Sequence, residues 1–212
     1  MTRNLNPDWY QSKVIRNKHI RIAGVAGTLA FGAALAWPAP AATAPADGAE
    51  AVAPITMVVD LSERKLYVRK DGDTIRTYQV AVGHPKHPTP KGNFGVQYVI
   101  WNPRWVPPDA EWAKDKKPHA PGDPKNPVGR VKMYFKQPDY YIHGTHVTES
   151  LGRAESKGCI RMRNGDVIAR AKLVMENSGT TRPAAWYKRV INTATRSQEV
   201  WMSKPVPLTV KS

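Results

Sequence analysis

Apolar and polar residues alternate along the first part of the chain that can form a core, which begins at Ile55. The segment "ITMVVDLSERKLYVRKDGDTIRTYQVAVG" contains three apolar or alternating stretches, at 55–60, 65–69 and 75–82. Turn residues separate them, and the polar "KDG" at 70–72 favours a hairpin between the second and the third. The pattern predicts three short antiparallel strands.

Further short apolar stretches predict strands at 95–100, 132–135, 140–144 and 206–210, with "KQPD" as the turn between the second and third of these. The period changes to that of a helix in "NGDVIARAKLVMENSG", where Asn164 or Asp166 can cap the start and Gly179 the end. A second helix is expected in "AAWYKRVINTA". These elements predict a mostly β domain with one or two C-terminal helices.

The segment from residue 101 to 130 shows neither the alternation of a strand nor the period of a helix, and it is rich in proline. Long ordered loops are uncommon in compact domains and tend to be functional. Its aromatic residues Trp101, Trp105 and Trp112 suggest a platform or lid over a bound peptide or sugar. The alternative is that at least one of them packs inside and anchors the loop.

The N-terminal part of the chain has the features of an export signal. An apolar run at 22–37, short for a membrane span, is preceded by Lys13, Arg16, Lys18 and Arg21 and followed by small residues and prolines. We expect a signal peptide or N-terminal membrane anchor at 1–41, an Ala/Pro linker at 42–54 and a folded domain at 55–210 with its core at 55–166. The domain is then exported to the periplasm or cell envelope, and is held at the inner membrane if the segment is not cleaved.

The formal net charge is +15, and it is +11 without residues 1–41. A charge of this sign favours anionic surroundings such as a lipid surface or a cell-wall polymer, or serves solubility alone. No nucleic-acid motif is present, and the export signal argues against a nucleic-acid partner. A single cysteine, Cys159, excludes an internal disulfide.

Cys159 lies in "ESKGCIRM", among groups that can activate a thiol. Lys157 and Arg161 supply positive charge, a predicted helix starts a few residues later, and His143 ends a predicted strand upstream. Gly158 permits the turn that an oxyanion-binding backbone requires. Each feature alone has a plainer explanation, since a lone cysteine is usually an inert small apolar residue.

The histidines together with Cys159 also raise the possibility of a metal site, because imidazole and thiolate are good zinc ligands. Their spacing matches no recognised ligand pattern. We therefore expect no metal and no cofactor.

Two separated motifs resemble the L,D-transpeptidase family, the YkuD-type catalytic domain. "IHGTHVTESLGRAESKGCIRMRNGDV" (142–167) is similar to its His-Gly-Thr and Ser-His-Gly-Cys signature, and "TPKGNF" (89–94) to its Pro-x-Gly-x-Phe element. The resemblance extends over about residues 55–166 and implies a β-sandwich-like catalytic fold. One position departs from the signature, because Lys157 stands where the family usually has histidine.

The resemblance implies that Cys159 is the nucleophile and His143 its proton acceptor and donor. It also implies that the Gly144 carbonyl orients His143 and that backbone N–H groups at Gly158 and Cys159 hold the oxyanion. The thiolate attacks the third residue of a peptidoglycan tetrapeptide stem, D-alanine leaves, and an amine resolves the thioester into a 3→3 cross-link. The expected substrate-binding residues are Arg161, Tyr141 and Trp105; for Arg161 a salt bridge that fixes the loop is an equal alternative.

Other activities remain open on the sequence. The acceptor can be a second stem, a D-amino acid or an envelope protein, and water as acceptor gives an L,D-carboxypeptidase or amidase with the same nucleophile. A noncatalytic peptidoglycan-binding module is the remaining class, and it requires that Cys159 be dispensable.

Overall fold

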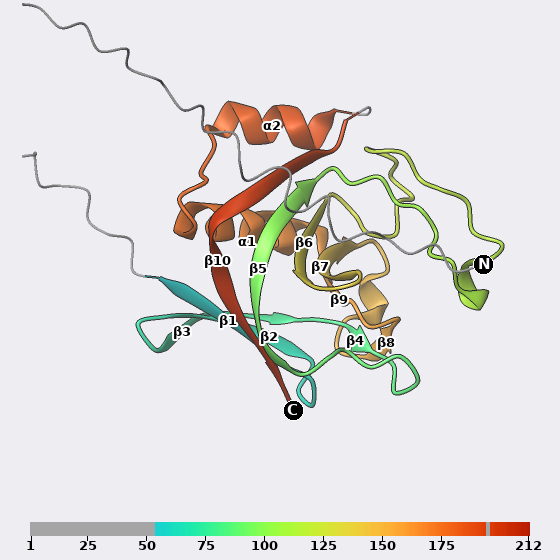
Figure 1. The fold of residues 1–212 in the computed structure, drawn as a ribbon, viewed down its shortest axis with the longest axis horizontal. Helices are drawn as coiled ribbons and strands as arrows, with labels where there is room; N and C mark the ends of the chain where they lie inside the picture. Colours follow the sequence, from blue (N-terminus) through green and yellow to red (C-terminus); the bar gives the residue numbers. More distant parts are fainter. Residues whose placement is uncertain (1–53, 194–195) are drawn as a thin grey trace, which may run out of the picture. The chain divides into compact units, whose positions relative to one another are not determined.

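The protein is built on one curled eight-stranded sheet (Figure 1). The computed structural model describes residues 54–193 and 196–212, so the expected signal or anchor at 1–41 and all but the last residue of the linker lie outside the described part. The elements in chain order are β1 (Ile55–Asp60), β2 (Lys65–Lys70), β3 (Asp73–Gln79), β4 (Val82–Gly83), β5 (Gly92–Trp101), η3 (Glu111–Ala113), β6 (Val131–Lys136), β7 (Tyr140–Thr145), η4 (Thr148–Ser150), β8 (Ala154–Ser156), β9 (Ile160–Arg163), α1 (Asn164–Asn177), α2 (Ala184–Asn192) and β10 (Gln198–Lys211). The predicted class, mostly β with two C-terminal helices, is confirmed.

The strand order in the large sheet is β3-β2-β1-β10-β5-β6-β7-β9. The three N-terminal strands are antiparallel, as the alternation predicts. The last strand, β10, lies parallel to β1 and antiparallel to β5, and thereby joins the N-terminal hairpin to the other half of the sheet. The prediction of a strand at 206–210 was too short, because β10 starts at Gln198 and continues through an irregularity between Trp201 and Val206.

Two features were not predicted at all. A two-residue strand, β4, pairs with β8 in a separate small sheet. The residues directly after Cys159 form the edge strand β9, which runs parallel to β7. The helix α1 therefore begins at the far end of β9, and its N-terminus does not lie beside the cysteine as the sequence suggested.

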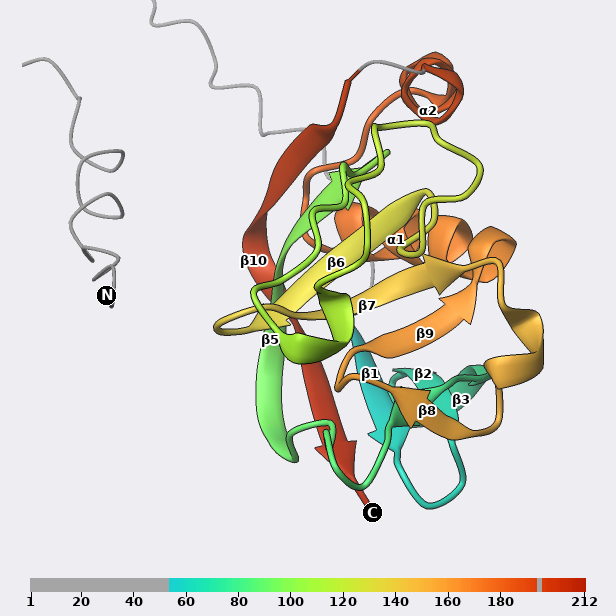
Figure 2. The same cartoon turned by 90° about the vertical axis from the view of Figure 1, so that its right-hand side faces the viewer.

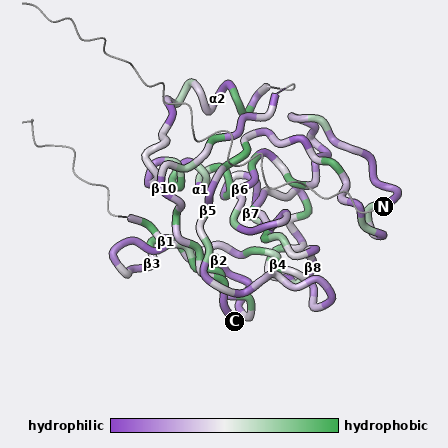
Figure 3. Tube along the Cα trace, viewed as in Figure 1, coloured by the Kyte–Doolittle hydropathy of each residue, from purple (hydrophilic) through white to green (hydrophobic). Residues whose placement is uncertain are grey.

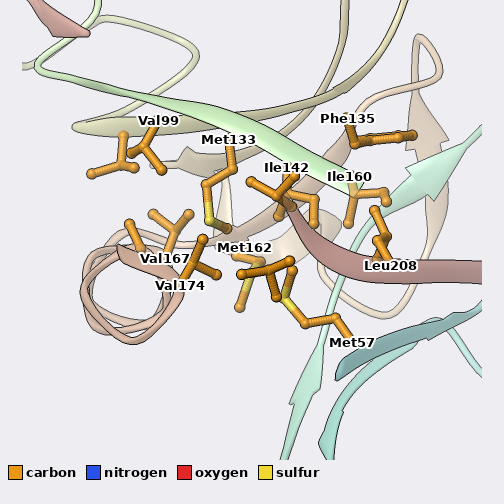
Figure 4. Close-up of a cluster of buried hydrophobic side chains, with 14 of the residues drawn as sticks. Met57, Val99, Met133, Phe135, Ile142, Ile160, Met162, Val167, Val174 and Leu208 are labelled. Carbon is orange, nitrogen blue, oxygen red and sulfur yellow. The ribbon is translucent and has the colours of Figure 1, made fainter. Parts of the chain in front are cut away.

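The apolar core fills the space between α1 and the inner face of the sheet. Figure 4 shows side chains from the helix, such as Val167 and Val174, facing Met133 and Ile142 from the strands. Because the sheet curls, Met57 of β1 belongs to the same cluster. Figure 3 shows hydrophobic stretches at the centre of the trace, whereas the tip of the β2–β3 hairpin is hydrophilic. Burial of one face in this way leaves the other face of β5–β6–β7–β9 for a binding site.

The long segment after β5 passes over this other face, on the side of the sheet opposite α1 (Figure 2). Trp101, the last residue of β5, is fully buried against Trp186 and Tyr187, so this tryptophan anchors the start of the loop by packing. Within the described part of the chain, no helix is long and apolar enough to cross a membrane.

Candidate active site

The strand register places the predicted reactive residues on one sheet face. His143 of β7 is paired with Arg161 of β9 on one side and with Lys132 of β6 on the other. Directly paired residues share a face, so the imidazole lies between two cationic side chains. Continuing the β7–β9 register by one residue brings Cys159 alongside Tyr141. The sequence motif "HGT…GC" thus becomes a single site because β7 and β9 are parallel neighbours.

His143 is held as a neutral base. Its side chain is buried, and Nδ1 lies 2.7 Å from the carbonyl oxygen of Gly144. The pKa of His143 is lowered to about 4, mainly by burial and to a lesser extent by the charges of Arg161 and Lys132, against the opposing effect of the Gly144 carbonyl. At neutral pH the remaining proton lies on Nδ1, where it is donated to Gly144, so Nε2 carries the lone pair.

Gly144 is also a position where the surrounding atoms leave no room for a side chain. A Cβ at this position would lie 2.1 Å from Oδ1 of Asn164, which accepts a hydrogen bond from the backbone N–H of Arg130. The Nδ2 of Asn164 donates to the carbonyl of Thr145. The Asn164 side chain, expected to cap α1, therefore ties the end of β7 to the helix start, and α1 begins without a side-chain cap.

The thiol of Cys159 is half-buried and protonated. Burial raises its pKa, while the backbone N–H of Tyr141 and the charges of Lys132 and Arg161 act in the opposite direction. Sγ donates to the carbonyl oxygen of Asp139 at 3.4 Å. The described contacts contain no hydrogen bond between Sγ and His143, so the thiol must turn from Asp139 before the imidazole can accept its proton. Longer separations of this kind are common in unliganded sites.

The turn before Cys159 is fixed by hydroxyl groups. Gly158 adopts φ +107, a region that favours glycine, and its N–H donates to Ser156 Oγ at 3.1 Å. Its carbonyl oxygen accepts from Thr89 Oγ1 at 2.9 Å, and Thr89 Oγ1 in turn accepts from the N–H of Gly83. The Gly158 N–H, expected to hold an oxyanion, is thus already engaged here. The Cys159 N–H makes no hydrogen bond to the described residues and is the free donor of the pair.

A cleft of about 1000 Å³ lies between these strands and the long loop, and Tyr141, His143, Cys159 and Arg161 all line it. Trp105 lines it from the loop, where its backbone pairs with that of His119. The charged groups that line the cleft are mainly cationic: seven lysines and arginines outnumber the one carboxylate, that of Asp139 (Arg104, Lys116, Lys117, Lys125, Lys132, Lys157 and Arg161). The cleft therefore suits an anionic ligand.

Lys157, the position where the sequence departs from the family signature, contacts the long loop. Its Nζ lies 5.8 Å from the ring centroid of Trp112 on the loop, and it is not among the charges that shift the pKa of Cys159. Its contact with the loop indicates that it helps to close the cleft. Among the described residues, no three His, Cys, Asp or Glu side chains are grouped closely enough to hold a metal ion.

The model of the YkuD family, described as the L,D-transpeptidase catalytic domain, matches residues 54–191. The chain belongs to this family. The family assignment that the two sequence motifs suggested is confirmed.

Known relatives of this L,D-transpeptidase family member share its central part. A protein of Fuscovulum blasticum whose name assigns it to the L,D-transpeptidases is 36% identical over 111 residues, which are 51% of this chain and 58% of the relative. YkuD of Bacillus subtilis is 31% identical over 128 residues, 60% of this chain and 65% of the relative. The chain thus spans less than two thirds of either protein. An L,D-transpeptidase structure from Mycobacterium smegmatis aligns with TM-score 0.47 and 18% identity over 76% of this chain and 59% of that one.

Sequence reasoning missed Lys132 and the two hydroxyls that hold the Gly158 turn. Lys132 had a detectable signal, because pairing "KMYF" with "YYIHG" about the "KQPD" turn brings it beside His143. Thr89 and Ser156 had none, since their contacts depend on the loop before β5 meeting the cysteine turn.

Proposed function

We propose that this family member is a cysteine-dependent acyltransferase that acts on peptidoglycan stem peptides outside the cytoplasm. The observation that carries the proposal is the protonation of the pair: a neutral His143 with a free Nε2 stands beside a neutral thiol in a cationic cleft. The family supports peptidoglycan cross-linking in general terms. The remaining steps are chemistry that this site can perform.

In the first half-reaction, Nε2 of His143 accepts the thiol proton as Sγ attacks the carbonyl carbon of the third stem residue. The developing thiolate is stabilised by the N–H of Tyr141 and by the charges of Lys132 and Arg161. The Cys159 N–H is positioned to donate to the oxyanion. When the tetrahedral intermediate collapses, Nε2 returns the proton to the leaving amine, and D-alanine departs from a thioester.

In the second half-reaction, an amine attacks the thioester carbonyl and gives its proton to Nε2. The C–S bond breaks, the proton passes to Sγ, and the amide is formed. An amine on a neighbouring stem gives a 3→3 cross-link. Arg161, whose side chain is in no ion pair of the described residues, is available for a carboxylate of the acyl-donating stem.

Incubation of the full chain with disaccharide tetrapeptide, followed by mass spectrometry, tests the proposal. We expect a covalent thioester on Cys159, loss of D-alanine, and cross-linked dimers. Cys159→Ala should abolish all three, with a fall in rate of at least ~1000-fold, because no other group can form the intermediate. Equal rates for the variant and the parent would refute it. Tripeptide without dimers would identify hydrolysis as the outcome of the same intermediate.

A further inference from the structure

Lys132 carries a half-buried ammonium group that forms no ion pair with any residue the structure describes. Its Nζ lies 4.2 Å from the ring centroid of Tyr141, which covers one side of the group. The ion pairs among the described residues all lie elsewhere, and none of their hydrogen bonds involves the Lys132 side chain. A charge removed from water without an acceptor is unfavourable. The ammonium is therefore suited to an anion that arrives with the ligand.

The position of Lys132 indicates where that anion must lie. Lys132 is the register partner of His143 and lines the same cleft as Cys159. Burial lowers the pKa of Lys132, and the negative charges of Asp139 and of a Cys159 thiolate oppose that shift, so both groups are near the ammonium. Asp139, the one carboxylate lining the cleft, accepts a hydrogen bond from the Tyr141 hydroxyl and forms no ion pair with Lys132. The space beside the nucleophile thus has a surplus of positive charge.

We propose that Lys132 binds the terminal carboxylate of the residue that leaves, and so selects stem peptides that end in a free carboxylate. This inference rests on the proposed acyl transfer. The terminal carboxylate is bonded to the carbon next to the scissile nitrogen, so covalent geometry keeps it closer to the attacked carbonyl than the other carboxylates of the stem. Arg161 lies on the opposite side of His143 and is left for the part of the stem that stays attached.

Binding of the carboxylate by Lys132 also orients the leaving group. It holds the scissile nitrogen on the β6 side of His143, where Nε2 can protonate it. The carboxylate departs with the free amino acid. The Lys132 ammonium is therefore again without a bound carboxylate in the second half-reaction. Lys132 is in this account a specificity-determining residue that touches the substrate, and its loss should matter only when the carboxylate is present.

Two synthetic donors test the inference with the full-length chain: a disaccharide tetrapeptide with a free terminal carboxylate, and the same compound with a terminal carboxamide. The second-order rate constant of Cys159 acylation is measured by mass spectrometry. Because a hydrogen bond to a charged group contributes substantially, we expect the parent to favour the carboxylate by ~10–100-fold. Lys132→Met should lose most of this preference by slowing only the carboxylate donor, and Lys132→Arg should restore much of it.

Three variants provide controls. Lys136→Met changes a lysine on the same strand that does not line the cleft, and it should keep the preference. Arg161→Met should slow both donors and keep their ratio. Lys132→Gln repeats the test if the methionine variant does not melt cooperatively.

The inference is overturned if the parent does not distinguish the donors, or if Lys132→Met slows both equally, which would mean that Lys132 only tunes the thiol. It is also overturned if the ratio is lost in Arg161→Met and kept in Lys132→Met. Acylation of the parent by neither donor is a separate result, which removes the proposed function and this inference with it.

Discussion

At His143, one hydrogen bond determines which nitrogen can act as the base. Donation from Nδ1 to the Gly144 carbonyl leaves Nε2 unprotonated, and burial between two cations keeps the ring neutral. The folded pKa of about 4 lies below the ordinary value of 6.5. The stabilisation due to neutral His143 is therefore present above about pH 6.5 and is lost as the pH falls through about 4.

The same shift predicts the pH dependence of acylation. The reactive pair has a neutral imidazole and a protonated thiol, and this form exists between the lowered pKa of His143 and the raised pKa of Cys159. We expect single-turnover acylation to be flat from about pH 5 to 8 and to fall to half near pH 4. Stopped assays across this range, with circular dichroism to confirm folding at each pH, check the profile. An acid limb near pH 6.5 would contradict it.

The reactive residues themselves were accessible from the sequence, whereas their electrostatics were not. Cys159 and His143 belong to motifs whose residue types indicate a thiol nucleophile with an imidazole base, and the structure brings both to one cleft. The expected lowering of the thiol pKa by Lys157 did not follow, because that side chain turns toward Trp112 and burial dominates at the sulfur. Burial and side-chain direction are properties of the packed molecule, which spacing along the chain does not specify.

At the scale of elements, the loop before β5 supports the cysteine turn through one buried hydroxyl. Thr89 Oγ1 accepts from Gly83 and donates to Gly158, and Thr89 is 3% exposed. Thr89→Val keeps the shape but leaves both backbone groups unpaired, which should lower the free energy of unfolding by roughly 2 kcal/mol and the Tm by roughly 4–8 °C. Thermal melts of the full chain measure the change.

A matched substitution separates this effect from a general loss of a threonine. Thr77 lies on β3 and is exposed, and no described side-chain hydrogen bond involves it. Thr77→Val should leave the Tm nearly unchanged. Equal melting temperatures for Thr89→Val and the parent would show that the hydroxyl does not hold the turn.

Strands with clear alternation and good turn residues were predicted well, and those without them were missed. The β1–β2–β3 meander follows from period two and the "KDG" turn. The small strand β4 and the edge strand β9 are too short to show a period. In β10, buried and exposed residues alternate from Val200 onward. Pro205, Pro207 and the irregularity after Trp201 interrupt this pattern, so it was not recognised as one strand.

At the scale of the whole molecule, charge should govern the encounter with the proposed cell-wall substrate. The chain has a formal net charge of +15 and presents a cleft rich in cations. Raising NaCl from 0.05 to 0.5 M should weaken binding of the full chain to purified anionic sacculi on the order of ten-fold, because exposed charges are screened. Sedimentation of the insoluble polymer with bound protein measures this. Salt-independent binding would indicate a contact dominated by apolar surface.

The place of β10 has a consequence for the order in which the molecule can be completed. β1 and β5 do not pair with each other, and β10 fills the gap between them. During synthesis from the N-terminus, residues 198–211 emerge after every other described strand. The half that holds Cys159 and the N-terminal hairpin must wait for that segment before they share one sheet. The sheet can therefore be completed only after residues 198–211 have been made, because β10 is the strand that pairs with both β1 and β5.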